Sequence, residues 1–95
     1  METEAYHDLS TAFAWYAEQA PHQLSRFESE IRAAEKELQT NPRSYRPIHR
    51  NARRFVLRIF PYRIWYVVND LQQEIDIIAF IHTRQDPGQY HGRIL

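Results

Sequence analysis

Residues 54–68, RFVLRIFPYRIWYVV, decide the fold class of this 95-residue chain. Apolar and polar side chains alternate in the first part of the stretch, which is the period of a β-strand with one buried face. The side chains expected to face a core are Phe55, Leu57 and Ile59. Those expected to face the other way are Arg54, Val56 and Arg58. After Pro61, which marks a turn, the β-branched and aromatic residues of 62–68 predict a second strand.

The sequence on the C-terminal side of this stretch continues the strand pattern. Residues 69–73, NDLQQ, predict a hairpin loop, and residues 74–83 predict a third strand. Beyond Arg84, the segment Asp86-Pro87-Gly88 predicts a turn-rich ending. Three strands joined by short loops predict an antiparallel meander with one covered face.

On the N-terminal side the period changes to that of a helix. Apolar residues spaced by three and four predict a helix over residues 5–19, which Pro21 ends. The residues of this apolar stripe are Tyr6, Leu9, Phe13, Tyr16, Ala17 and Ala20. The same spacing predicts a second helix that closes at Asn41-Pro42, followed by a connecting loop over residues 41–51. The apolar residues that define this helix are Leu24, Phe27, Ile31, Ala34 and Leu38. We therefore expect one α+β domain over residues 1–95, an N-terminal antiparallel helical hairpin packed on a three-stranded antiparallel β-meander.

The composition excludes several classes of protein. Apolar residues make up 43% of the chain and cysteine is absent, so one core is expected without disulfides, thiolate nucleophiles or cysteine zinc sites. No apolar run reaches the length of a membrane span, and the acidic start is unlike a signal peptide, so we expect a cytoplasmic protein. With two glycines and no metal-binding histidine spacing, neither a cofactor nor a metal is expected.

The formal net charge of zero is the sum of two opposed halves. Residues 1–40 carry three basic and eight acidic side chains, a net charge of −5, whereas residues 41–95 carry nine basic and four acidic ones, +5. All basic residues but Lys36 are arginine, whose planar fork binds phosphate or carboxylate in two-point contacts. Codon usage of a GC-rich genome would explain the same bias equally well.

Strand alternation predicts that polar side chains gather on the sheet face away from the helices. The residues expected on this common surface are Arg54, Arg58, Arg63, Trp65, His82, Arg84 and Tyr90. Such a group could bind phosphates, stack a base and move a proton, or it could bind an acidic protein partner. Solvated surface arginines with no function are the third interpretation.

The order of these elements and several local motifs resemble the RelE/ParE toxin superfamily, on its ParE-like, plasmid-stabilisation side. The resemblance spans residues 4–93. The motifs that carry it are Glu4-Ala5 through Trp15-Tyr16-Ala17-Glu18-Gln19, Arg26-Phe27, Asn41-Pro42 with Tyr45, Pro47 and His49, Arg53-Arg54, Phe60-Pro61-Tyr62-Arg63-Ile64-Trp65-Tyr66, and Ile81-His82-Thr83-Arg84-Gln85-Asp86-Pro87 to Tyr90.

This resemblance implies the toxin of a type II toxin–antitoxin system, neutralised by a cognate antitoxin. A ParE-like member inhibits DNA gyrase without catalytic activity. A RelE-like member is instead a ribosome-dependent mRNA endoribonuclease, and the matching catalytic positions would be Arg54, Arg63, Arg84 and Tyr90. Val56 stands where that pattern has a second basic residue on the strand, and a pI near 7.0 is low for an RNA-binding protein. The ParE-like interpretation is therefore preferred.

The resemblance also has one departure. The family has a β-strand before its first helix, and here only Met1 to Glu4 precede the predicted helix. An open sheet edge would follow, and with it a tendency to form homo-oligomers. A decayed, non-toxic paralogue that only binds an antitoxin is therefore a further alternative.

Overall fold

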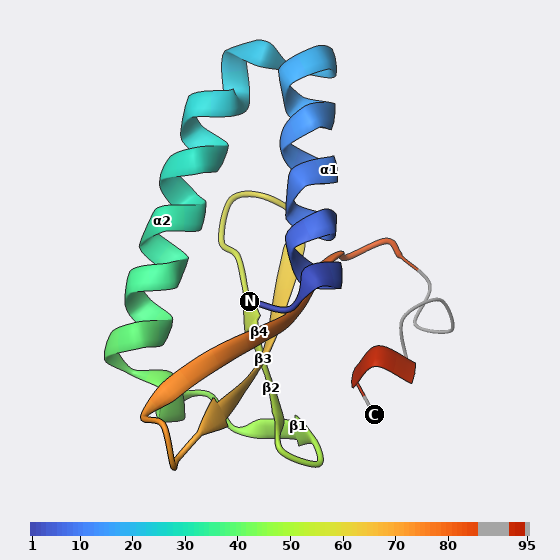
Figure 1. Ribbon diagram of the computed structural model, residues 1–95. Coiled ribbons are helices and arrows are strands. Elements are labelled where there is room, and N and C mark those ends of the chain that lie inside the picture. Colours follow the sequence, from blue (N-terminus) through green and yellow to red (C-terminus); the bar gives the residue numbers. More distant parts are fainter. Residues whose placement is uncertain (86–91, 95) are drawn as a thin grey trace.

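The computed structural model describes residues 1–85 and 92–94, and within them the expected α+β architecture is confirmed (Figure 1). Two antiparallel helices stand over one side of an antiparallel sheet. The helical elements are α1 (Thr3–Gln19), η1 (Pro21–Gln23), α2 (Leu24–Thr40) and η2 (Pro42–Ser44). The strands are β1 (Pro47–His49), β2 (Ala52–Val56), β3 (Tyr62–Asn69) and β4 (Glu74–His82). None of the helices in the described ranges combines the length and the apolar character that crossing a bilayer requires.

The sheet has four strands in the order β1-β2-β3-β4, one more than predicted. The additional strand, β1, lies in the segment expected to be a loop. Arg50 adopts a left-handed φ of 52°, and the tight turn around it lets Pro47 and His49 pair with Arg53 and Ala52. A turn made by a non-glycine residue gives no clear signal in a sequence, so the strand could not be anticipated.

A cluster of aromatic side chains fills the space between the helices and the sheet. Phe27 of α2 is fully buried at its centre. The ring of Phe27 lies 4.6 Å from that of Tyr16, 5.1 Å from Phe60 and 5.6 Å from Tyr62, measured between ring centroids. Edge-on and stacked pairs of this kind add to the free energy gained by burial. The cluster fixes both helices on the sheet.

The strand predicted over residues 54–59 ends early, at Val56. Leu57 is buried as expected, but Ile59 is 58% exposed in the loop that joins β2 to β3. The carboxylate of Glu30, on α2, accepts hydrogen bonds from the backbone N–H groups of Arg58, Ile59 and Phe60, each at 2.9 Å. The loop backbone is therefore bound to α2 instead of to a neighbouring strand, and Ile59 is turned out of the core.

A bulge in β4 changes which side of the sheet its residues face. Trp65 of β3 pairs with Ala79, but the next residue, Tyr66, pairs with Ile77, so Ile78 is an extra residue. Before the bulge the odd-numbered residues Ile75 and Ile77 face the helices, whereas after it the even-numbered residues Phe80 and His82 do. The predicted alternation through the whole third strand is therefore wrong beyond this point.

A smaller apolar cluster lies on the sheet face away from the helices. Its buried members are Ala52, Trp65, Ala79, Ile81 and Ile94. Ile94 comes from a helical turn at residues 92–94 (drawn in red in Figure 1), so a C-terminal turn covers part of this face.

The outer edge of β4, expected to be open, has polar contacts along its length. The backbone N–H of Glu2 donates to the Ile77 carbonyl at 2.9 Å, and the N–H of Phe80 donates to the Asp8 carboxylate at 3.1 Å. Arg93 donates to the same carboxylate at 2.7 Å and to the Ile78 carbonyl at 3.3 Å. These contacts occupy backbone groups of β4 that a neighbouring strand would otherwise use.

Candidate functional site

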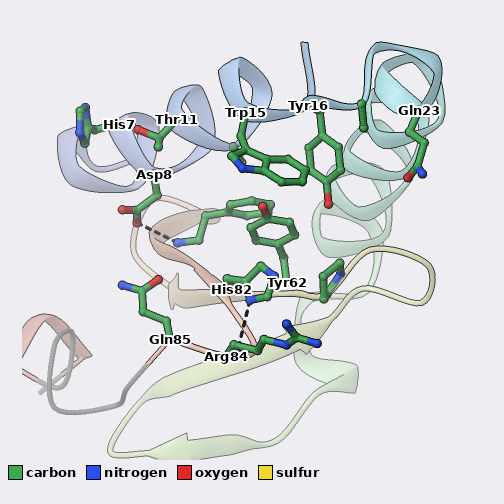
Figure 2. Close-up of a pocket in the computed structure, with 14 residues that line it drawn as sticks. His7, Asp8, Thr11, Trp15, Tyr16, Gln23, Tyr62, His82, Arg84 and Gln85 are labelled. Atoms are coloured by element: carbon green, nitrogen blue, oxygen red, sulfur yellow. Dashed lines mark hydrogen bonds between the residues drawn. The ribbon is translucent and has the colours of Figure 1, made fainter. Parts of the chain in front are cut away.

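A cleft of about 830 Å³ lies between α1 and the end of the sheet where Tyr62 pairs with His82 (Figure 2). Helix α1 supplies Trp15 and Tyr16 to one wall, and the sheet supplies Tyr62 and Phe80 to the other. Polar side chains stand around the opening. They are His7, Asp8, Thr11, Gln23, His82, Arg84 and Gln85.

Trp15 and Tyr16 are neighbours in α1 but differ in burial. Tyr16 is 6% exposed because it packs in the aromatic core, whereas Trp15 is 54% exposed at the mouth of the cleft. The two rings meet edge to face with their centroids 5.0 Å apart. A large aromatic side chain is therefore held in place by the core and still open to a ligand or partner.

His82 and Arg84 form a small structured unit at the end of β4. The backbone N–H of Arg84 donates to Nδ1 of His82 at 3.0 Å. Because Nδ1 accepts this bond, the neutral imidazole carries its proton on Nε2. The His82 ring meets Tyr62 edge to face, 5.1 Å between centroids, and the Arg84 side chain is exposed at the rim.

Asp8 lines the cleft, but its carboxylate is already engaged. It accepts hydrogen bonds from the Phe80 N–H and from Arg93, whose guanidinium also lies 3.1 Å from Glu4. The bond to Asp8 raises the pKa of Arg93 above its usual value. Asp8 therefore ties α1 to β4 and to the C-terminal turn, and its negative charge is neutralised within the chain.

Burial raises the pKa of Tyr62 well above that of a free tyrosine, and the neighbouring Tyr16 adds to this shift. In the unfolded chain the Tyr62 hydroxyl would ionise near pH 10, whereas in the native protein it stays protonated. The stability that the protonated hydroxyl of Tyr62 contributes is therefore complete below pH 10 and is lost as the pH rises further. We expect the unfolding free energy of the wild type to fall more steeply above pH 10 than that of Tyr62→Phe, by up to about 1.4 kcal/mol per pH unit.

Urea unfolding at pH 8, 10 and 11 measures this difference in slope. Tyr6→Phe, which removes a hydroxyl from a side chain that is 66% exposed, is the matched control. Parallel pH profiles for Tyr62→Phe and the wild type would contradict the expectation.

The surface predicted to unite the functional residues is divided in two. Arg54, Arg63 and Trp65 do share the sheet face away from the helices, and the Arg54 guanidinium lies 5.7 Å from the centre of the Trp65 ring. The bulge in β4 places His82 on the helix side of the sheet instead, beside Tyr62 and the cleft.

The remaining predicted residues are also separated from that group. Arg84 lies with His82 at the cleft, and Arg58 lies in the loop bound by Glu30, where it is exposed. Tyr90 falls outside the described residues. The expectation of a single basic surface is therefore wrong for His82, Arg84 and Arg58. It assumed regular strand alternation, whereas β4 contains a bulge before His82 and Arg84, and β2 ends before Arg58.

The α1 wall of the cleft was not anticipated from the sequence. The predicted apolar stripe of the first helix included Tyr6, which is 66% exposed, and omitted Trp15. Trp15, a large aromatic residue outside the apolar stripe of the first helix, was the feature of the sequence that could have indicated this exposed wall. In the part of the chain that the structure describes, no three His, Asp or Glu side chains are grouped to hold a metal ion.

Comparison with known proteins gives consistent matches. Residues 1–87 match the family described as the ParE toxin of the type II toxin–antitoxin system parDE. Toxin ParE2 of two Mycobacterium tuberculosis strains, CDC 1551 / Oshkosh and H37Rv, is 32% identical over 88 residues. The matched region covers 92% of this chain and 82% of the mycobacterial toxin.

Proposed function

Because this chain belongs to the ParE toxin family of type II toxin–antitoxin systems, we propose that it inhibits DNA gyrase in the bacterial cytoplasm and is neutralised by a cognate antitoxin. The family match over residues 1–87 is the observation that carries the proposal. An antitoxin partner follows from membership of the family. The gyrase target is the step that we add.

The placement of the arginines supports a binding protein over a ribonuclease. Cleavage of RNA requires several cations around one phosphate to stabilise the charge that develops there. Arg54 and Arg63 lie on the far face of the sheet, whereas Arg84 lies at the cleft lined by α1. The three arginines of the RelE-like pattern therefore lie on two different sides of the sheet. The formal net charge of zero also gives little of the electrostatic affinity on which RNA binding depends.

Inducible expression in bacteria tests the proposal when growth, plasmid supercoiling and mRNA integrity are followed in the same culture. We expect growth arrest with loss of negative supercoiling and intact mRNA. Purified protein is expected to inhibit supercoiling by purified gyrase in the absence of other factors. The Phe27→Ala variant, whose core is disrupted, is the control for effects of expression alone.

Two other outcomes would contradict the proposal in different ways. Growth arrest with cleaved mRNA and normal supercoiling would identify a ribonuclease. Normal growth at high levels of folded protein would identify a non-toxic paralogue.

A further inference from the structure

The cleft between α1 and the sheet has the composition of a protein-binding hot spot. Binding energy in protein interfaces is concentrated at Trp, Tyr and Arg side chains that line concave, desolvated regions. Trp15, Tyr62 and Arg84 all line this cleft. Trp15 is exposed on one wall and Tyr62 is buried on the other, so an apolar side chain inserted between them would lose contact with water.

The charges at the cleft favour a carboxylate. Asp8 is the acidic residue of the lining, and it is already bound to Arg93 and to the Phe80 N–H. Arg84 has no carboxylate partner among the described residues, and its side chain is exposed. The proton on Nε2 of neutral His82 is a second donor beside it. The rim therefore offers donors that no acceptor within residues 1–85 and 92–94 occupies.

The far face of the sheet is less suitable for the same purpose. Its tryptophan, Trp65, is 6% exposed, because Arg54 stacks on its ring and Ile94 belongs to the same buried cluster. An aromatic residue that the chain already covers can add little apolar contact to a partner. Of the two places where tryptophan and arginine meet in the described residues, the cleft is the open one.

We propose that this cleft is the surface that binds gyrase, by taking an apolar side chain between Trp15 and Tyr62 and pairing an adjacent carboxylate with Arg84. The inference rests on the proposed function and adds the location and chemistry of the contact. The bound segment of gyrase thus carries an aromatic or aliphatic side chain next to an acidic one.

Two variants test the cleft with purified gyrase. Trp15→Ala removes the exposed wall, and Arg84→Glu reverses the charge at the rim. We expect each to raise the concentration needed for half-maximal inhibition of supercoiling, and the Kd for gyrase, by at least about tenfold. Arg84→Lys, which keeps the charge but loses the planar fork, is expected to lie between Arg84→Glu and the wild type.

The chain offers a matched control for each change. Tyr6→Ala removes another exposed aromatic side chain from α1, and Arg46→Glu reverses another exposed arginine, but neither residue lines the cleft. Both are expected to inhibit gyrase like the wild type. Far-UV circular dichroism and thermal unfolding show that each variant is folded, which is expected because Trp15 and Arg84 are exposed.

The possible failures can be told apart. If the wild type inhibits gyrase and the cleft variants inhibit it equally well, the inference is wrong and the proposed function stands. Loss of neutralisation by a co-expressed antitoxin in those same variants would then assign the cleft to the antitoxin. If the wild type neither binds nor inhibits gyrase, both the function and the inference are overturned.

Discussion

Replacing Phe27 with alanine is expected to lower the free energy of unfolding by about 3–5 kcal/mol. The ring is fully buried and meets aromatic side chains from α1, from the β2–β3 loop and from β3 and β4. Alanine would leave a cavity that these rings cannot close, because they are held by both helices and the sheet. For a domain of this size the loss equals a large part of the total stability.

Chemical unfolding in urea, followed by far-UV circular dichroism, measures the effect of Phe27→Ala. Phe27→Leu, which keeps most of the apolar volume, is expected to lose less than half as much. Leu71→Ala is the control, because Leu71 is 98% exposed at the tip of the β3–β4 hairpin. A loss below about 1 kcal/mol for Phe27→Ala would mean that the aromatic cluster is not the centre of the core.

Glu30→Ala is expected to destabilise the chain by about 2 kcal/mol, although Glu30 is only half-buried. Its carboxylate accepts the backbone N–H groups of Arg58, Ile59 and Phe60. Hydrogen bonds to a charged acceptor are stronger than neutral ones, but solvent near Arg58 and Ile59 would replace part of what is lost. The loop between β2 and β3 would no longer be bound to α2.

Thermal unfolding measures this prediction, with an expected decrease in Tm of about 10 °C for a domain of this size. Glu30→Gln keeps one acceptor oxygen and is expected to lie between the wild type and Glu30→Ala. Glu18→Ala removes an exposed carboxylate from α1 and controls for the change of charge. Faster amide hydrogen exchange at residues 58–60 in Glu30→Ala would locate the effect, and an unchanged Tm would refute it.

The helices and the type of sheet could be predicted because the signal lies in the spacing of apolar residues. All five apolar residues that defined the second helix lie in α2, and four of them are buried. The buried ones are Phe27, Ile31, Ala34 and Leu38. Pro21 begins η1, immediately after the first helix ends, as its fixed φ and missing N–H group favour.

The features that could not be predicted depend on contacts between distant parts of the chain. The early end of β2 follows from Glu30, which is 28 residues away from the first loop residue that it binds. The bulge in β4 lies opposite Trp65 and Tyr66 of β3, which pack in the two separate apolar clusters on either side of the sheet. Neither the early end of β2 nor the bulge in β4 is marked by a turn residue in the sequence. The sequence pattern therefore predicts uninterrupted alternation of side chains in both segments.

Only a small part of the cleft lining could be predicted from the sequence. His82 and Arg84 were predicted to share a surface, and they lie together at the cleft. Their expected companions Arg54 and Arg63 lie on the opposite side of the sheet, and the residues that face them come from α1. Residues from a helix and a strand end can be brought together only by packing, which a linear pattern does not encode.

The extra residue in β4 also affects how this surface can change in evolution. If Ile78 paired as a regular strand residue instead of forming a bulge, every later side chain of the strand would turn to the other side of the sheet. His82 would then face Arg54 and Arg63, while Phe80 would leave the aromatic core. Deleting the codon for Ile78 would instead remove the bulge and leave His82 beside Tyr62, so this surface can lose its extra residue and keep the side of the sheet that His82 faces.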